Sequence, residues 1–398
     1  MRAYSASDEE TLRTRELIED WRSEGLLTAE QYSRMEQETR CDLRRTNIFL
    51  RLVLFFFTLI ITGAAVGLFF VMIHPPDRAA GVLLMIFAGL CYASAEFAVA
   101  NYQFYRHGIE EALVACSVGF LCVGIQVAFF KALFSSAGQN GWIVPAAGAV
   151  LSLWIWHRFG LPYAPFAAMI FVAWLPGYGT SFPWAQHLIL AAFYLAGVAI
   201  IAVLRPRHRF TYLDGQYSIA EALLWLGIYL AINLQLSSLD LLDSWWRSVP
   251  AASLFPRPFY WTTWVLTWCL PPVMLARGLR MKDRWVIAVG GITAILTFIT
   301  NKPYLGWQRH TWDPMLLGAL LVGIAFVIQR RLGNAPGGIR HGFTAQRLSG
   351  KDKRWMNVGI TAIGLVSPDI VAPRPQPAGP EPHFGGGDSG GGGATSDF

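Results

Sequence analysis

Residues 48–73 read IFLRLVLFFFTLIITGAAVGLFFVMI, and this stretch carries no charged side chain from Leu52 to Ile73. A helix rises about 1.5 Å per residue, so roughly 20 apolar residues cross the hydrocarbon core of a bilayer, which is about 30 Å thick. The stretch therefore predicts a membrane-spanning helix. It is too long, and begins too far along the chain, for a cleavable signal peptide, so we expect it to remain as a signal anchor.

Basic residues flank this helix unequally. Arg40, Arg44, Arg45 and Arg51 precede or open it, whereas Arg78 follows it. By the positive-inside rule this asymmetry predicts a cytoplasmic N-terminus, and every later span takes its direction from this one.

The composition agrees with a membrane protein. Hydrophobic residues make up 54% of the chain and charged residues 15%, against about 45–50% and about 25% in soluble domains. The net charge of +6 is explained by basic residues at the cytoplasmic ends of spans, so we expect no nucleic-acid partner. The five cysteines include no C-x-x-C pair, and neither a zinc site, another cofactor nor a disulfide framework is indicated.

Nine further apolar segments predict an all-α fold, a polytopic transmembrane helix bundle of about ten spans within residues 48–329. Two consecutive segments, 142–157 and 162–176, are short for a full crossing, and a re-entrant pair there would reduce the count to eight. We place the segments at residues 79–100, 112–134, 142–157, 162–176, 184–204, 219–237, 258–276, 285–300 and 312–328.

The loop charges support ten spans. In that arrangement the cytoplasmic loops hold nine Lys and Arg residues and the outer loops five. We therefore expect a multi-pass protein of the inner (cell) membrane, in contact with the lipid bilayer, with both termini in the cytoplasm. The outer loop at residues 238–256 has leucine and tryptophan at helical spacing, which predicts a helix lying flat in the outer interface.

Residues 1–47 predict a cytosolic helical hairpin. Ser7 with Glu10, and Thr28 with Gln31, have the spacing of a capping box at a helix start. Gly25 stands where the first helix would end in a left-handed turn. One interpretation is an amphipathic hairpin that lies on the membrane or on the protein's own loops. The sharper interpretation is a docking module for a cytoplasmic protein partner.

The run LIEDWRSEGLLTAEQYSRM, residues 17–35, followed shortly by many spans, resembles the start of an uncharacterised bacterial family of predicted multi-pass membrane proteins. That family is a domain of unknown function, named for its N-terminal segment and first spans. The resemblance covers about the first quarter of the chain and implies no catalytic or ligand-binding residues. In the docking interpretation, the contact residues are Trp21, Leu26 and Tyr32.

The C-terminal residues 330–398 are basic, then rich in proline, then rich in glycine. This composition buries too little apolar area to offset the entropy of ordering, and it predicts a flexible cytosolic tail. Residues 355–371 are more apolar, and we favour a surface-associated segment there over an eleventh span.

Four polar residues within the apolar segments are candidates for a polar pathway or for interhelical contacts: Glu96, Gln126, Glu221 and Asn233. Glu96 and Glu221 are expected near the cytoplasmic side, where an ion pair with Arg158 or with the basic residues 205–209 is the simpler interpretation. A buried Gln or Asn is typical of an interhelical hydrogen bond.

Two further patterns concern helix packing. Gly63 and Gly67 form a G-x-x-x-G pair, which predicts a close approach to another helix, with a neighbouring span favoured over a second subunit. Pro271 and Pro272 predict a break or kink in the eighth span.

The sequence contains no Walker A loop and no helical metal-binding pair, and no G-x-S-x-G motif within residues 1–329, so we expect no enzyme activity. The favoured function is a membrane protein with an assembly, sensing or regulatory role through its hairpin. The first alternative is a transporter or channel for a small substrate that is not driven by a deeply buried acidic relay. The second is a membrane-embedded enzyme acting on lipid or on a lipid-linked sugar.

Overall fold

The computed structural model describes residues 2–344 apart from residues 24, 40, 42, 45, 131–140, 209–210, 237–254, 306, 308–311, 335–338 and 341–342. These residues are helical apart from turns and loops and one short antiparallel pair, β1 (Ile339–Arg340) with β2 (Phe343–Thr344). The all-α prediction is therefore confirmed. Residues 238–254 of the predicted interfacial helix lie outside the described residues, as do residues 345–398 of the predicted tail, which include the segment 355–371.

The N-terminal hairpin consists of α1 (Ala6–Ser23) and α2 (Ala29–Glu38). At the start of α2, Thr28 accepts a hydrogen bond from the Gln31 N–H at 3.3 Å, and the Gln31 side chain accepts one from the Thr28 N–H at 3.0 Å. Gly25 has the predicted left-handed conformation, with a φ of 74°. The capping box predicted at Ser7 is wrong because α1 already begins at Ala6, and Ser5 accepts the Asp8 N–H at 3.4 Å instead.

Within the described residues, six helices are long and apolar enough to cross a membrane: α3 (Ile48–Ile73), α4 (Asp77–Tyr102), α5 (Ile109–Phe130), α9 (Pro183–Leu204) with the 3-10 turn η1 (Arg205–His208), α10 (Asp214–Ile232) and α14 (Arg284–Tyr304). The other helices of this region are the shorter α6 (Ile143–Phe159), α7 (Ala164–Trp174) and α8 (Pro176–Gly179), and the long α13 (Arg257–Met281) and α15 (Asp313–Gly333). Each of the ten predicted segments overlaps one of these helices.

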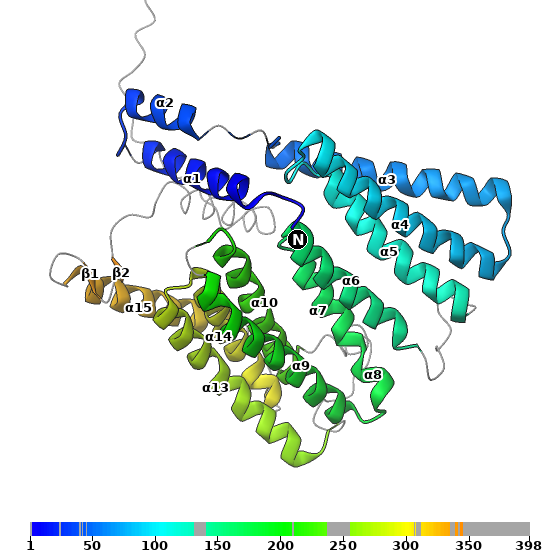
Figure 1. The fold of residues 1–398 in the computed structure, drawn as a ribbon. Helices are drawn as coiled ribbons and strands as arrows, with labels where there is room; N and C mark the ends of the chain where they lie inside the picture. The colour runs from blue at the N-terminus through cyan, green and yellow to red at the C-terminus, as the bar shows by residue number, and fades with distance from the viewer. Residues whose placement is uncertain are drawn as a thin grey trace, which may run out of the picture.

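Figure 1 shows two groups of helices. In the first group α3, α4 and α5 lie side by side and α6 packs on α5; in the second group α9, α10, α13 and α14 pack together. The helix α7 lies between the groups, against α6 on one side and α9 and α10 on the other.

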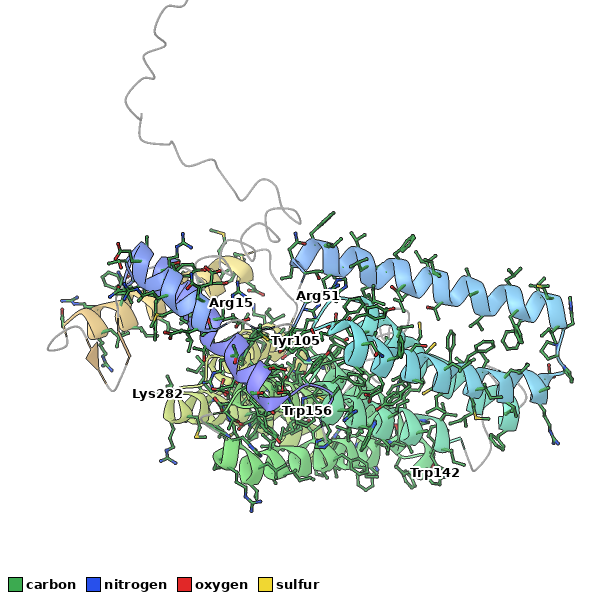
Figure 2. The ribbon with its side chains drawn as sticks, turned by 45° about the horizontal axis from the view of Figure 1, so that its top comes forward. Arg15, Arg51, Tyr105, Trp142, Trp156 and Lys282 are labelled. Carbon is green, nitrogen blue, oxygen red and sulfur yellow. The ribbon has the colours of Figure 1, made fainter. Side chains whose placement is uncertain are left out.

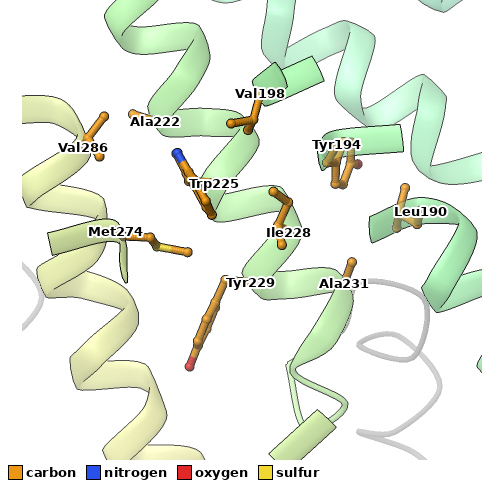
Figure 3. Close-up of a cluster of buried hydrophobic side chains, with 10 residues drawn as sticks. All are labelled: Leu190, Tyr194, Val198, Ala222, Trp225, Ile228, Tyr229, Ala231, Met274 and Val286. Carbon is orange, nitrogen blue, oxygen red and sulfur yellow. The ribbon is translucent and has the colours of Figure 1, made fainter. Parts of the chain in front are cut away.

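Each group has its own buried core, and the two cores share no residue. The core of the second group centres on Trp225 and Tyr229 of α10, with Met274 of α13 and Tyr194 of α9 beside them (Figure 3). The core of the first group consists of Tyr4, Ala95, Val99, Val114, Ile155, Phe159, Leu161 and Ala164.

Glycines allow α4 and α5 to approach closely. A Cβ placed on Gly81 would lie 2.3 Å from the backbone nitrogen of Ala128, and one on Gly124 would lie 2.8 Å from the Gly81 carbonyl oxygen. By contrast, no atom of the described chain lies within 4 Å of a Cβ placed on Gly63 or Gly67. The close approach predicted for that pair does not occur among the described residues.

Two predicted helix boundaries differ from the structure. The helix α10 ends at Ile232, because Asn233 leaves the helical conformation and begins a turn. The helix α13 runs unbroken through Pro271 and Pro272, so the predicted break is absent.

Candidate functional site

Residues 2–10, which we call the N-terminal clasp, lie across the end of the bundle at which α3 begins and α6 ends. The Ala3 N–H donates a hydrogen bond of 2.8 Å to the carbonyl of Arg158, at the end of α6. Tyr4 is 5% exposed and belongs to the core of the first group, where its ring meets Tyr105 edge-to-face at 4.9 Å. The clasp is therefore part of the first group's core.

The clasp also contacts the second group. The Arg2 guanidinium donates to Gln216 of α10 at 2.6 Å and to Glu9 of the clasp at 2.9 Å, and it lies over the ring of Tyr212. Glu10 accepts a hydrogen bond from the Tyr212 N–H at 3.2 Å. The clasp thus joins two helix groups whose cores are separate (Figure 1).

Gly160 leaves room for this junction. It ends α6 with a φ of 65°, and a Cβ there would lie 2.8 Å from the Gln216 amide and 3.2 Å from the Arg2 guanidinium. L side chains rarely adopt this backbone conformation, and a Cβ would also lie too close to Gln216 and Arg2. Glycine suits the position for both reasons.

Beneath the clasp, Arg51 of α3 faces two consecutive carboxylates of α5. Arg51 binds Glu111 through two N–H groups, one of them at 2.8 Å. Glu110 is fully buried, and its Oε1 accepts the His107 N–H at 2.7 Å. The other oxygen of Glu110, Oε2, is buried and has no hydrogen-bond partner among the described residues.

Two phenols share this environment. The hydroxyls of Tyr4 and Tyr163 are buried, and neither has a hydrogen-bond partner within the described chain. Burial, and then the charge of Glu110, raises the pKa of Tyr4, while burial, and then the charge of Glu111, raises the pKa of Tyr163. Both phenols therefore stay neutral at ordinary pH. Figure 2 shows Arg51, Tyr105 and Trp156 around the point where α1 meets the membrane helices.

The four polar residues singled out in the sequence do not come together. Glu96 of α4 pairs with Arg158 of α6 at 2.6 and 2.7 Å and accepts a hydrogen bond from Tyr92 at 3.0 Å. Gln126 lies half-buried in α5. Both residues belong to the first group, whereas Glu221 lies about two turns into α10 and Asn233 directly follows its last residue.

Glu221 belongs to a buried charge network at the end of the second group. Arg205 lies 2.8 Å from Glu221, 2.6 Å from Asp283 and 3.1 Å from Asp214, and Arg277 binds the other oxygen of Glu221. Buried charges are tolerated when they are paired in this way. The network joins η1 and the helices α10 and α13 to the start of α14.

Asn233 is fully buried and links α10 to α14. Its amide donates to the Tyr229 hydroxyl at 2.9 Å and to Thr300 at 3.0 Å, and its carbonyl accepts the Gln235 N–H at 3.1 Å. These contacts are interhelical and local hydrogen bonds, and they account for the polar side chain at this depth.

The hairpin tip carries the residues considered for docking. Trp21 is 42% exposed and Leu26 66% exposed. The Leu26 N–H binds the Trp21 carbonyl at 3.0 Å and the Gly25 N–H binds that of Arg22 at 3.0 Å, which is the Schellman pattern at a helix end. Tyr32 is half-buried under the Arg22 guanidinium, 4.1 Å from the ring centroid.

No pattern in the sequence predicts the clasp. Arg2 and Tyr4 stand outside any motif, and their partners Gln216 and Tyr105 are far away in the sequence. The adjacent pair Glu110 and Glu111 at the start of a span was the available signal for the buried carboxylates. No group of three metal-binding side chains occurs among the described residues.

No family model, no curated protein and no solved structure matches the chain. The resemblance of residues 17–35 to a bacterial membrane-protein family stays a prediction.

Proposed function

We propose that this chain is a non-catalytic integral membrane protein that acts in assembly, sensing or regulation through its N-terminal hairpin. The observation that supports this most directly is the clasp. It is bonded to Arg158 in the first helix group and to Gln216 in the second, while the tip of the same hairpin exposes Trp21 and Leu26.

The clasp gives the hairpin a fixed attachment. Two helices of 18 and 10 residues are marginal alone in water, because helix stability comes mostly from packing an apolar face. Ile18 of α1 is buried, and so is Tyr4 just before the helix, which packs in the core of the first group. A protein bound at the tip would therefore act, through α1, on a segment that joins both groups.

The exposed tip has the chemistry of a protein-binding surface. Tryptophan is enriched among the residues that contribute most to binding energy at interfaces. Leu17, one turn before Trp21 on α1, is 45% exposed and extends the apolar surface.

We further propose ten spans in the inner membrane with both termini in the cytoplasm, so that the hairpin faces the cytoplasm. The unequal loop charges support this orientation. Reporter fusions after Pro206 and Met281 should give cytoplasmic signals, and fusions after Gly138 and Ser253 periplasmic signals. A periplasmic signal at Met281 would overturn the arrangement.

The docking role is tested by cross-linking in cells. A photoreactive amino acid placed at Trp21 or Leu26 should cross-link another protein, whereas one placed at the buried Ile18 should not. Cross-links to lipid alone from positions 21 and 26 would contradict the proposal and favour a hairpin that lies on the membrane surface.

A further inference from the structure

Among the described residues, the charges beneath the clasp do not balance. Two carboxylates, Glu110 and Glu111, meet one guanidinium, Arg51, and that guanidinium is bonded to Glu111. In the part of the chain that the structure describes, no ion pair reaches Glu110, which is fully buried. An uncompensated buried charge is costly, and a carboxyl group in such a place is more stable when a positive charge joins it.

The ligand that fits this buried position is a proton, the smallest one possible. Both oxygens of Glu110 are shielded from solvent: Oε1 is used by the His107 N–H and Oε2 is buried without a partner. A proton on Oε2 neutralises the charge of the carboxylate. The Tyr4 and Tyr163 hydroxyls lie close enough for the charge of Glu110 to act on them, but neither forms a hydrogen bond with Oε2, so neither stabilises a negative charge there.

We propose that Glu110 binds a proton and that this proton locks the N-terminal clasp onto the bundle. Tyr4 is buried in the first group's core, close enough to Glu110 for the charge of that carboxylate to act on its phenol. When the proton leaves, the charge on Glu110 must be hydrated, and moving Tyr4 aside is the way to admit water. The clasp therefore opens as the pH rises, and the hairpin is then released from both helix groups.

The groups around Glu110 are consistent with this direction. Arg51 stays charged and bound to Glu111, and Tyr4 and Tyr163 stay neutral because the pKa of each is raised by burial. The pKa of the His107 imidazole is lowered, first by burial and then by the charge of Arg44, so this side chain supplies no compensating charge at neutral pH.

The clasp itself holds three more carboxylates, those of Asp8, Glu9 and Glu10, and one more cation, Arg2. Glu9 is paired with Arg2, and burial raises the pKa of Glu9 although Arg2 opposes the shift. Arg106, whose charge also acts on Glu9, lies over the ring of Tyr105. Glu10 is exposed and bonded to the Tyr212 N–H. None of these groups reverses the direction of the pH response, in which the clasp opens as the pH rises.

The inference rests on the proposed function only for its biological meaning, namely that the cytoplasmic proton concentration is the signal that the hairpin reports. The lock itself is a property of the chain alone. If position 21 cross-links no protein, the docking role fails while the lock can still be measured.

The first test measures the distance between the hairpin and the second helix group. Spin labels are attached at Leu26→Cys and Arg207→Cys, two exposed positions, in the full chain with its native cysteines replaced, in lipid nanodiscs. We expect a single narrow distance distribution at about pH 6 and a second, broader population at higher pH. For one linked proton, the ratio of closed to open forms falls by up to about tenfold per pH unit.

The variant Glu110→Gln should stay closed over the whole pH range, because the amide keeps the oxygen that binds the His107 N–H and carries no charge. The matched control Glu96→Gln, changed in a carboxylate that pairs with Arg158, should keep the wild-type response. A wild-type distribution that does not change with pH, or a response that persists in Glu110→Gln, would overturn the proposal.

The second test detects the proton directly and does not require the labels. The wild-type protein at neutral pH should show the infrared C=O stretch of a protonated carboxyl group, and this band should be absent in Glu110→Gln and shifted in Tyr4→Phe. Absence of the band in the wild type, or its persistence in Glu110→Gln, would show that Glu110 is not the proton site.

Discussion

The hydroxyl of Thr297 in α14 lies 3.1 Å from the carbonyl oxygen of Thr267 in α13. That carbonyl has no intrahelical partner, because its donor would be the N–H of residue 271 and Pro271 has none. Thr297 also lies 2.9 Å from the carbonyl of Thr293 and 2.9 Å from the Tyr229 hydroxyl, which can donate to it. A neighbouring helix thus satisfies the group that proline leaves free, and α13 continues as a helix.

We expect Thr297→Val to lower the free energy of unfolding by about 1 kcal/mol, the scale of an interhelical hydrogen bond in a membrane. The loss should be smaller in a Pro271→Ala background, where residue 271 regains an N–H for the Thr267 carbonyl. Denaturation of the four proteins in mixed micelles gives the coupling energy. If Thr297→Val lowers the free energy of unfolding equally in the two backgrounds, the Thr297 hydroxyl does not stabilise the protein through the Thr267 carbonyl.

Removing Arg205 should destabilise the second helix group strongly. Arg205→Ala leaves Glu221 and Asp283, whose side chains are each 1% exposed, without their common cation, and losing one partner of a buried pair costs about 3–5 kcal/mol. Arg207→Ala, two residues away and exposed, should change stability by less than about 0.5 kcal/mol. Thermal unfolding of the purified proteins compares the two, and a small effect of Arg205→Ala would mean that water replaces the guanidinium.

The contact between α4 and α5 should tolerate no side chain at Gly81. Gly81→Ala places a methyl group 2.3 Å from the backbone of Ala128, and such overpacking costs about 1–3 kcal/mol. Gly89→Ala in the same helix is the matched control, because no atom lies within 4 Å of a Cβ there; it should be neutral or stabilising, since alanine favours helix by about 1 kcal/mol over glycine. If both variants unfold at the same denaturant concentration, the close approach does not exist.

Glu9 should add an acid-range component to the pH dependence of the clasp. Burial raises its pKa above the ordinary value of 4.5, so the docked form holds a proton more tightly than the undocked form. The clasp is therefore favoured below pH 4.5 and weakens as the pH rises through the window between that value and the raised one.

The variant Glu9→Gln should remove this acid-range change in the distance between the labels at positions 26 and 207, and leave the change at higher pH intact. Exposed Glu19 on the same helix, 57% exposed at its side chain, is the control, and Glu19→Gln should alter neither component. If Glu9→Gln also abolished the change at higher pH, that change would be due to Glu9 of the clasp and not to Glu110.

Local features of this chain were predictable because their physical causes lie within a few residues. The uncharged run of residues 52–73 determines a membrane helix by composition alone. Thr28 and Gln31 bind each other's backbone across three residues, and Gly25 takes the left-handed turn that other residues resist. Helix ends were less predictable. A serine at position 5 or at position 7 can cap a helix, and the structure uses Ser5. The helix α10 ends at Ile232, and the Asn233 that follows it binds Thr300 of α14.

Only the tertiary structure decided which polar groups meet. Glu96 binds Arg158 and Glu221 binds Arg205, the ion pairs that the sequence suggested, but the sequence does not show that Arg277 and Asp283 join the second pair. Arg2 reaches Gln216 across 214 positions, and within the described chain Glu110 has no ion pair because Arg51 is bonded to its neighbour Glu111. Hydropathy and capping depend on neighbours along the chain, so the sequence by itself determines the helices. The clasp and the unpaired carboxyl group beneath it depend on how those helices pack, because distance in space, not in sequence, sets which charges compensate each other.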